Sequence, residues 1–224
     1  MHGNSCGIIG KEEQMKKFYL FDLDGTLIDS MRQWSQKMLL ILERENIPYP
    51  EDIIQKITPL GDVKTAEYFI RLGVKKSVEE ILAAMDAYAE DEYAHKIPLK
   101  PYVREYLMHL QHRGASLNVL TASPHKLTDV CLKRNSVWNC FENVWSTEDF
   151  GLAKSDPQIF HAVARKLCSS EEDILFFDDN LLALAAAKKA GLKTVGVFDA
   201  SSLASEEEMK GYSDRYIHSF QELL

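Results

Sequence analysis

The stretch FYLFDLDGTLIDS, from Phe18 to Ser30, joins an apolar run to two closely spaced aspartates. Its first four residues have the composition of a buried strand, and Asp22 and Asp24 follow them directly. Residues i and i+2 of a strand point to the same face, so we expect both carboxylates to project together, roughly 7 Å apart. Gly25 then lets the chain turn sharply. The stretch therefore predicts an acidic site at the end of a buried strand.

Composition and charge limit the classes of partner. The 224-residue chain is 46% hydrophobic and 27% charged, which is ordinary for a globular protein, and its net charge is -8. This charge argues against a nucleic-acid partner, and an anionic ligand would have to meet a local positive group or a metal. No apolar run approaches the ~18 residues of a membrane span, so we expect no membrane partner. A monomer is the default expectation.

The thiols and the first residues indicate a cytoplasmic protein. The cysteines form no C-x-x-C pair and no zinc-finger spacing, which is typical of reduced thiols in the cytosol: Cys6, Cys131, Cys140 and Cys168. Residues 1–17 lack the apolar core of a signal peptide, and we interpret them as a flexible leader.

Periodicity separates two kinds of segment. Residues 31–96 show apolar stripes at helical spacing, with Ser30 as the expected N-cap of the first helix, and predict a compact helical bundle without strands. Pro98 and Pro101 mark a linker after the bundle. Beyond it, strands and helices alternate, which indicates an α/β fold with a parallel sheet covered on both faces. The helical segment therefore interrupts this fold just after its first strand.

Polar side chains also follow the other expected strands. Thr121 follows the strand of residues 116–120, and Asp178 and Asp179 follow that of residues 173–177. Lys154 stands just before the expected helix of residues 157–167. Ligands of open parallel sheets bind at the carboxyl ends of the strands, so we expect these groups to meet. Carboxylates without a nearby His or Cys favour Mg²⁺ as the cation among them.

This set of residues predicts phosphoryl transfer. Asp22 would be the nucleophile that forms an aspartyl-phosphate, and Asp24 would be general acid to the leaving oxygen and then general base for water. Thr121 and Lys154 would hold the phosphoryl oxygens. Asp178 would bind Mg²⁺, and its neighbour Asp179 would orient the metal ligands.

In these residues the chain resembles the haloacid dehalogenase superfamily. FDLDGTLIDS matches the first motif of that superfamily, Thr121 in NVLTAS the second, Lys154 the third and FFDDN the fourth. The resemblance spans residues 18 to about 200 and includes a similarity to phosphoglycolate phosphatase and β-phosphoglucomutase relatives. It departs at Ser155, where a proline usually follows the lysine, and at Leu182, where a later carboxylate often lies.

The resemblance implies a Rossmann-like core with an inserted, mobile type 1 helical cap. The core would comprise residues 18–30 and 97–224 and the cap residues 31–96, with hinges near residues 28–30 and 96–101. The Asp24 main-chain carbonyl would join Asp22 and Asp178 around Mg²⁺. The implied phosphate-binding residues are Asp22, Gly25, Thr121, Ala122 and Lys154.

The expected function is hydrolysis of a small phosphorylated metabolite by a Mg²⁺-dependent phosphatase. The alternative is a sugar phosphomutase of the β-phosphoglucomutase type, which would share every core residue. A phosphoacceptor signalling domain is a remote alternative, because its acidic pair would come first in the chain. Asp24 argues against a dehalogenase and an imine-forming hydrolase. Substrate choice would depend on residues of the cap: Trp34, Thr58, Asp62 and Lys64.

Overall fold

A six-stranded, all-parallel sheet forms the centre of the molecule. The computed structural model describes residues 17–57 and 60–224, so Thr58 and nearly all of the expected leader lie outside the described residues. The strand order is β3-β2-β1-β4-β5-β6, which confirms the α/β, Rossmann-like fold class. The strands are β1 (Phe18–Phe21), β2 (Ser116–Thr121), β3 (Asn143–Ser146), β4 (Ile174–Asp178), β5 (Lys193–Val197) and β6 (Arg215–Ile217).

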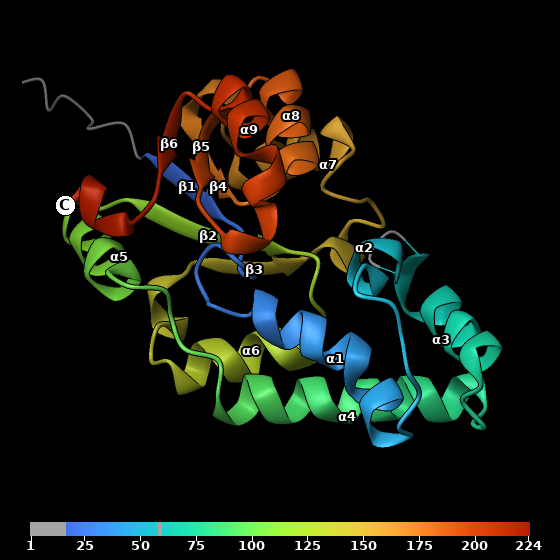
Figure 1. The fold of residues 1–224 in the computed structure, drawn as a ribbon. Coiled ribbons are helices and arrows are strands. Elements are labelled where there is room, and N and C mark those ends of the chain that lie inside the picture. Colours follow the sequence, from blue (N-terminus) through green and yellow to red (C-terminus); the bar gives the residue numbers. More distant parts are fainter. Residues whose placement is uncertain (1–16, 58–59) are drawn as a thin grey trace, which may run out of the picture.

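Helices cover both faces of this sheet (Figure 1). Neighbouring residues of β1 alternate between the two layers, with Phe21 in one apolar cluster and Leu20 in the other. The first layer contains α5 (Val103–His112), α6 (His125–Arg134) and the 3-10 helix η6 (Phe220–Leu223). The second contains α7 (Pro157–Leu167) and α8 (Leu181–Ala190), with α9 (Glu206–Tyr212) packed on α8. The remaining 3-10 helices are η2 (Trp138–Cys140), η3 (Thr147–Asp149), η4 (Glu171–Asp173) and η5 (Ala200–Ser205).

Four α-helices between β1 and α5 lie beyond one edge of this layer, and the last of them packs against α6 (Figure 1). They are α1 (Met31–Arg44), α2 (Ile53–Ile57), α3 (Gly61–Leu72) and α4 (Val78–His95). Their apolar faces build a core of their own, which includes Leu42, Phe69 and Met85. Ser77 and Glu80 form a capping box that fixes the start of α4. We refer to this group, residues 31–96, as the cap.

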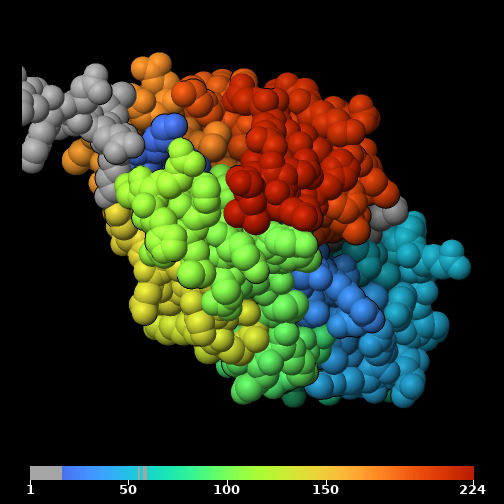
Figure 2. All heavy atoms as spheres, turned by 90° about the vertical axis from the view of Figure 1, so that its left-hand side faces the viewer, coloured from blue at the N-terminus to red at the C-terminus, as the bar shows by residue number. Residues whose placement is uncertain are grey.

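Two linkers join the cap to the sheet and run side by side. Asp29 N donates to Pro98 O and Lys100 N donates to Leu27 O, each at 3.0 Å. Figure 2 shows the blue atoms of α1 packed beside the green atoms of the chain that follows the cap. Within the described residues, no helix has the length and apolar character that a membrane crossing requires.

Candidate active site

The acidic turn begins where β1 leaves the sheet. Asp22 is 3% exposed, and its backbone N–H still donates to Phe177 O at 2.9 Å. Leu23 is buried, and its carbonyl accepts from the N–H groups of Leu27 and Ile28, which closes a tight turn. The turn sends the Asp22 and Asp24 side chains to different partners.

Gly25 allows this turn to pass close to Asp179. Its φ is +79°, and a Cβ added there would lie 2.3 Å from Asp179 Oδ2. Only glycine adopts this conformation readily, and only glycine leaves room for the carboxylate. Thr26 Oγ1 donates to the other carboxylate oxygen at 3.4 Å. The turn after β1 and the end of β4 are therefore packed directly against each other.

Lys154 joins the ends of β1 and β4. Its ammonium donates to Asp178 Oδ2 at 2.7 Å and to Asp22 Oδ1, although the three residues are far apart in the sequence. Asp178 is fully buried, and its Oδ1 accepts from Asn180 N at 2.8 Å. Burial alone would lower the pKa of Lys154, but the two carboxylates outweigh it and raise that pKa, so the ammonium stays charged.

The carboxylates outnumber this ammonium. Asp22, Asp178 and Asp179 each offer an oxygen, and these oxygens lie within 4.8 Å of one another. Burial raises the pKa of Asp22 to about 7, opposed by Lys154 and reinforced by Asp178 and Asp24. Burial and the Asp178 charge also raise the pKa of Asp179 well above its ordinary value. A buried, oxygen-only and negatively charged donor set of this kind fits Mg²⁺.

Thr121 is the last residue of β2, the strand that lies beside β1 on the side opposite β4. It is 1% exposed, and its Oγ1 accepts from Ser123 N at 3.0 Å. Because the backbone occupies a lone pair of the oxygen, the hydroxyl hydrogen can be donated to a ligand. Ala122 lies exposed in the same turn.

The Asp24 side chain turns away from Lys154, towards the cap. Its oxygens accept hydrogen bonds from Ser30, Trp34, Tyr93 and Ser123. Of the expected specificity residues, the structure thus brings Trp34 to the site. Asp62 instead pairs with the buried Lys37, and Lys64 is exposed on α3.

Four residues of this network, one of which is Ser30, were not predicted from the sequence as site residues. Ser123 follows Thr121 by two residues, a spacing that could have pointed to it. Tyr93 and Lys37 lie within amphipathic helices, where nothing in the pattern separates a functional side chain from a packing one. Lys37 lies 4.5 Å above the Trp34 ring, so it supports a residue that contacts Asp24.

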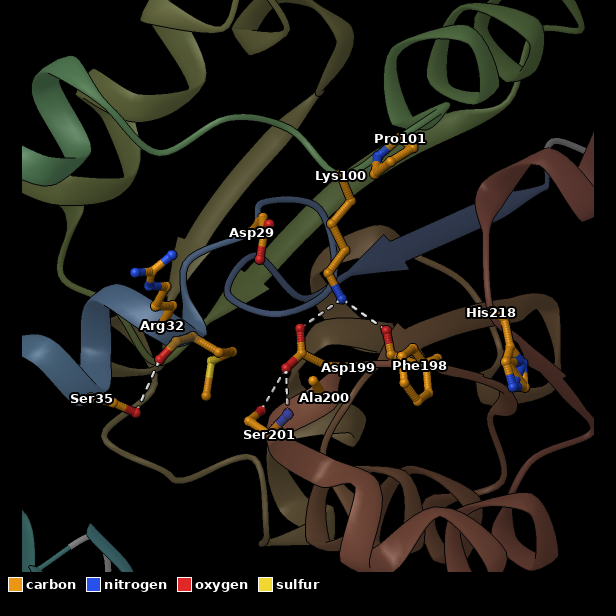
Figure 3. A pocket seen from close by; sticks show the side chains of 11 residues that line it. Asp29, Arg32, Ser35, Lys100, Pro101, Phe198, Asp199, Ala200, Ser201 and His218 are labelled. Carbon is orange, nitrogen blue, oxygen red and sulfur yellow. Dashed lines mark hydrogen bonds and ion pairs between the residues drawn. The ribbon is translucent and has the colours of Figure 1, made fainter.

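A cavity of about 530 Å³ lies where the linkers meet the loop after β5. Figure 3 shows Lys100 spanning it to reach Asp199 at 2.8 Å and the carbonyl of Phe198. Arg32 lines the opposite side, on α1. None of the lining residues belongs to the carboxylate cluster, so this cavity lies at the junction of the cap with the sheet and is distinct from that cluster.

Comparisons with known proteins agree with this arrangement. The model of the family described as haloacid dehalogenase-like hydrolase matches residues 19–197. Validoxylamine A 7'-phosphate phosphatase of Streptomyces hygroscopicus subsp. limoneus is 26% identical over 86% of this chain and 92% of its own. Phosphoglycolate phosphatase of Pseudomonas putida is 27% identical over 82% of this chain and 70% of its own. The crystal structure of a putative β-phosphoglucomutase from Thermotoga maritima superposes with a TM-score of 0.76 at 22% identity, over 90% and 94% of the two chains.

Proposed function

Since the chain belongs to the haloacid dehalogenase-like hydrolase family, we propose that it is a Mg²⁺-dependent phosphatase of small phosphorylated metabolites. The observation that supports this most directly is the cluster of three buried carboxylates around Lys154. Its excess of negative charge is unfavourable in a buried site, and a bound cation would offset it. The related proteins named as phosphatases of small phosphorylated compounds support the same class of substrate.

Each residue of the site has a role in this proposal. An Asp22 oxygen attacks phosphorus, and the bond from phosphorus to the leaving oxygen breaks as Asp24 protonates that oxygen. Thr121 and Lys154 donate to the phosphoryl oxygens and balance their developing charge. Water then attacks the aspartyl-phosphate and gives its proton to Asp24, which releases phosphate and restores Asp22.

The metal would be held by Asp22, Asp178 and the Asp24 carbonyl. Mg²⁺ bound there would neutralise phosphoryl oxygens and relieve the repulsion among the carboxylates. The Asp179 carboxylate, which Gly25 allows to come close, would support these ligands. Asp22 and Thr121 are almost fully buried, so the substrate enters only when the cap moves.

The test is Asp22→Asn, assayed against a panel of phosphate monoesters with Mg²⁺ and with EDTA. The amide keeps the shape but removes the nucleophile and one negative charge, so kcat should fall by at least about a thousand-fold. Asp52→Asn, which alters an exposed aspartate of the cap, is the matched control and should keep full activity. Phosphatase activity that survives in Asp22→Asn, or in EDTA, would contradict the proposal.

The phosphomutase alternative needs its own assay. The wild-type protein would be incubated with β-glucose 1-phosphate and a bisphosphate primer. A phosphatase releases inorganic phosphate, whereas a mutase forms the isomer without releasing it. Isomer formation without free phosphate would replace the phosphatase proposal by the mutase.

A further inference from the structure

The Asp24 carboxylate is held asymmetrically. Oδ1 accepts from Ser30 Oγ at 2.7 Å, from Trp34 Nε1 at 3.4 Å and from the Tyr93 hydroxyl. Oδ2 accepts from Ser123 Oγ at 2.6 Å. Three donors thus meet one oxygen, and the other oxygen points to the turn that follows β2.

Tyr93 is the most deeply buried of the Oδ1 donors that come from the cap. It lies near the end of α4, is 2% exposed and packs in the apolar cluster of the sheet rather than in that of the cap. Its phenol oxygen can donate one hydrogen bond and accept another at the same time. Trp34 Nε1 donates to the Tyr93 oxygen at 3.0 Å, which directs the phenolic hydrogen towards Asp24.

We propose that Tyr93, oriented by Trp34, is a positioning residue for proton transfer by Asp24. This inference rests on the proposed phosphatase activity. The Oδ1 donors fix the carboxyl group, so that Oδ2 is the oxygen that carries the proton. Oδ2 lies on the side of Ser123, next to Thr121, where the phosphoryl group is proposed to bind.

With Asp24 Oδ2 as the oxygen that carries the proton, the bonds that form and break in both steps of the reaction can be stated. In the first step, Oδ2–H gives its proton to the bridging oxygen as the old P–O bond breaks and the bond from Asp22 to phosphorus forms. In the second step, Oδ2 accepts a proton from water as the water oxygen bonds to phosphorus and the Asp22–phosphorus bond breaks. Asp24 is regenerated, and Tyr93 stays neutral throughout.

The arrangement also links proton transfer to the cap. Trp34 lies on α1 and Tyr93 on α4, whereas Asp24 and Ser123 belong to the sheet side. A displacement of α1 relative to the sheet would move Trp34, which donates both to Asp24 and to the Tyr93 oxygen. The orientation of the Asp24 carboxyl group therefore depends on side chains from both α1 and α4.

The test compares Tyr93→Phe with wild type on a series of aryl phosphates from 2,4-dinitrophenyl to phenyl phosphate. Dinitrophenolate leaves without protonation, whereas phenolate needs an acid, and the ring size hardly changes. We expect kcat/KM of Tyr93→Phe to fall about ten-fold or more for phenyl phosphate and by less than about two-fold for 2,4-dinitrophenyl phosphate. The parameter kcat/KM covers the reaction up to the first irreversible step, the transfer to Asp22.

The matched control is Tyr88→Phe. Tyr88 lies on the same helix, and its hydroxyl bonds Gln36 within the cap at 3.0 Å. It should behave as wild type across the series. Tyr93→Phe added to Asp24→Asn should not steepen the leaving-group dependence further, because Tyr93 acts through Asp24.

The results that would contradict this role of Tyr93 can be told apart. An equal loss on all aryl phosphates would make Tyr93 a structural residue, and no loss would remove it from the reaction. If Tyr93→Phe does not fold, Trp34→Phe removes the donor that orients the phenol and takes its place under the same criteria. A wild-type protein that hydrolyses none of the series would overturn the proposed phosphatase, and this inference with it.

Discussion

Gly25→Ala tests whether the turn after β1 and Asp179 are packed as tightly as the structure indicates. The substitution places a side chain at φ +79°, which costs roughly 1–2 kcal/mol for a residue other than glycine. The new Cβ would also lie 2.3 Å from Asp179 Oδ2, and an overpacked buried site typically costs about 1–3 kcal/mol more. The expected loss of unfolding free energy is therefore about 3 kcal/mol, the sum of both effects.

Thermal unfolding of metal-free protein, followed by circular dichroism, measures this loss. For a chain of this size, about 3 kcal/mol corresponds to a fall in Tm of about 6–12 °C. Gly114→Ala is the matched control, because Gly114 has φ +73° and nothing within 4 Å of an added Cβ. It carries only the backbone cost of roughly 1–2 kcal/mol, so its Tm should fall by about 2–8 °C, which is less than the fall for Gly25→Ala.

A double-mutant cycle isolates the contact itself. In an Asp179→Ala background the carboxylate is gone, so Gly25→Ala should cost only as much as the Gly114 control. If Gly25→Ala and Gly114→Ala lower Tm equally in the wild-type background, the close approach of Asp179 is wrong. If the cost of Gly25→Ala is the same with and without Asp179, it comes from the backbone alone.

Three further perturbations follow from the contacts of the site and the cap joint. Lys154→Met should lower the unfolding free energy of the metal-free protein by roughly 3–5 kcal/mol. Added Mg²⁺ should restore most of this stability in a fluorimetric melt, and a loss that Mg²⁺ leaves unchanged would count against a metal at this cluster. Thr121→Val should lower kcat about 10²–10³-fold, whereas Thr121→Ser keeps the hydroxyl and most of the activity. Burial opposes the hydrogen bonds from Lys100 and Ser201 to Asp199, but the net effect lowers the Asp199 pKa. The stability advantage of wild type over Asp199→Asn should then be full above about pH 4 and disappear as the pH falls through the lowered pKa, as urea unfolding from pH 7 to pH 3 would show.

The central part of the fold was predictable because burial constrains its sequence strongly. Strands covered on both faces are apolar throughout, and their polar exits stand out, as at Asp22, Thr121 and Asp178. The last strand and helix were not predicted. β6 has only three residues, Arg215–Ile217, and lies at the edge of the sheet, where partial exposure gives no clear apolar pattern.

Local rules failed where a distant residue decides the role of a side chain. Ser30 stands at the N-cap position of α1, as expected, but its hydroxyl makes no cap hydrogen bond and donates to Asp24 instead. The approach of Asp179 to Gly25 likewise depends on two strands that are 153 positions apart at Thr26 and Asp179. Such contacts arise from tertiary packing, and a single sequence does not show which oxygen atom a given side chain will contact.

The two aspartates of the opening motif are the same residue type, and they differ in the groups that surround their carboxylates. Asp22 meets an ammonium and two other carboxylates, and this charged environment suits a nucleophile that also binds a cation. Asp24 meets hydroxyl and indole donors, two of them from the cap, and this environment suits a group that passes a proton. Because the turn at Gly25 directs one side chain to β4 and the other to α4, the same short stretch can provide both chemistries. The roles proposed for the two carboxylates therefore depend on the cap as much as on the motif.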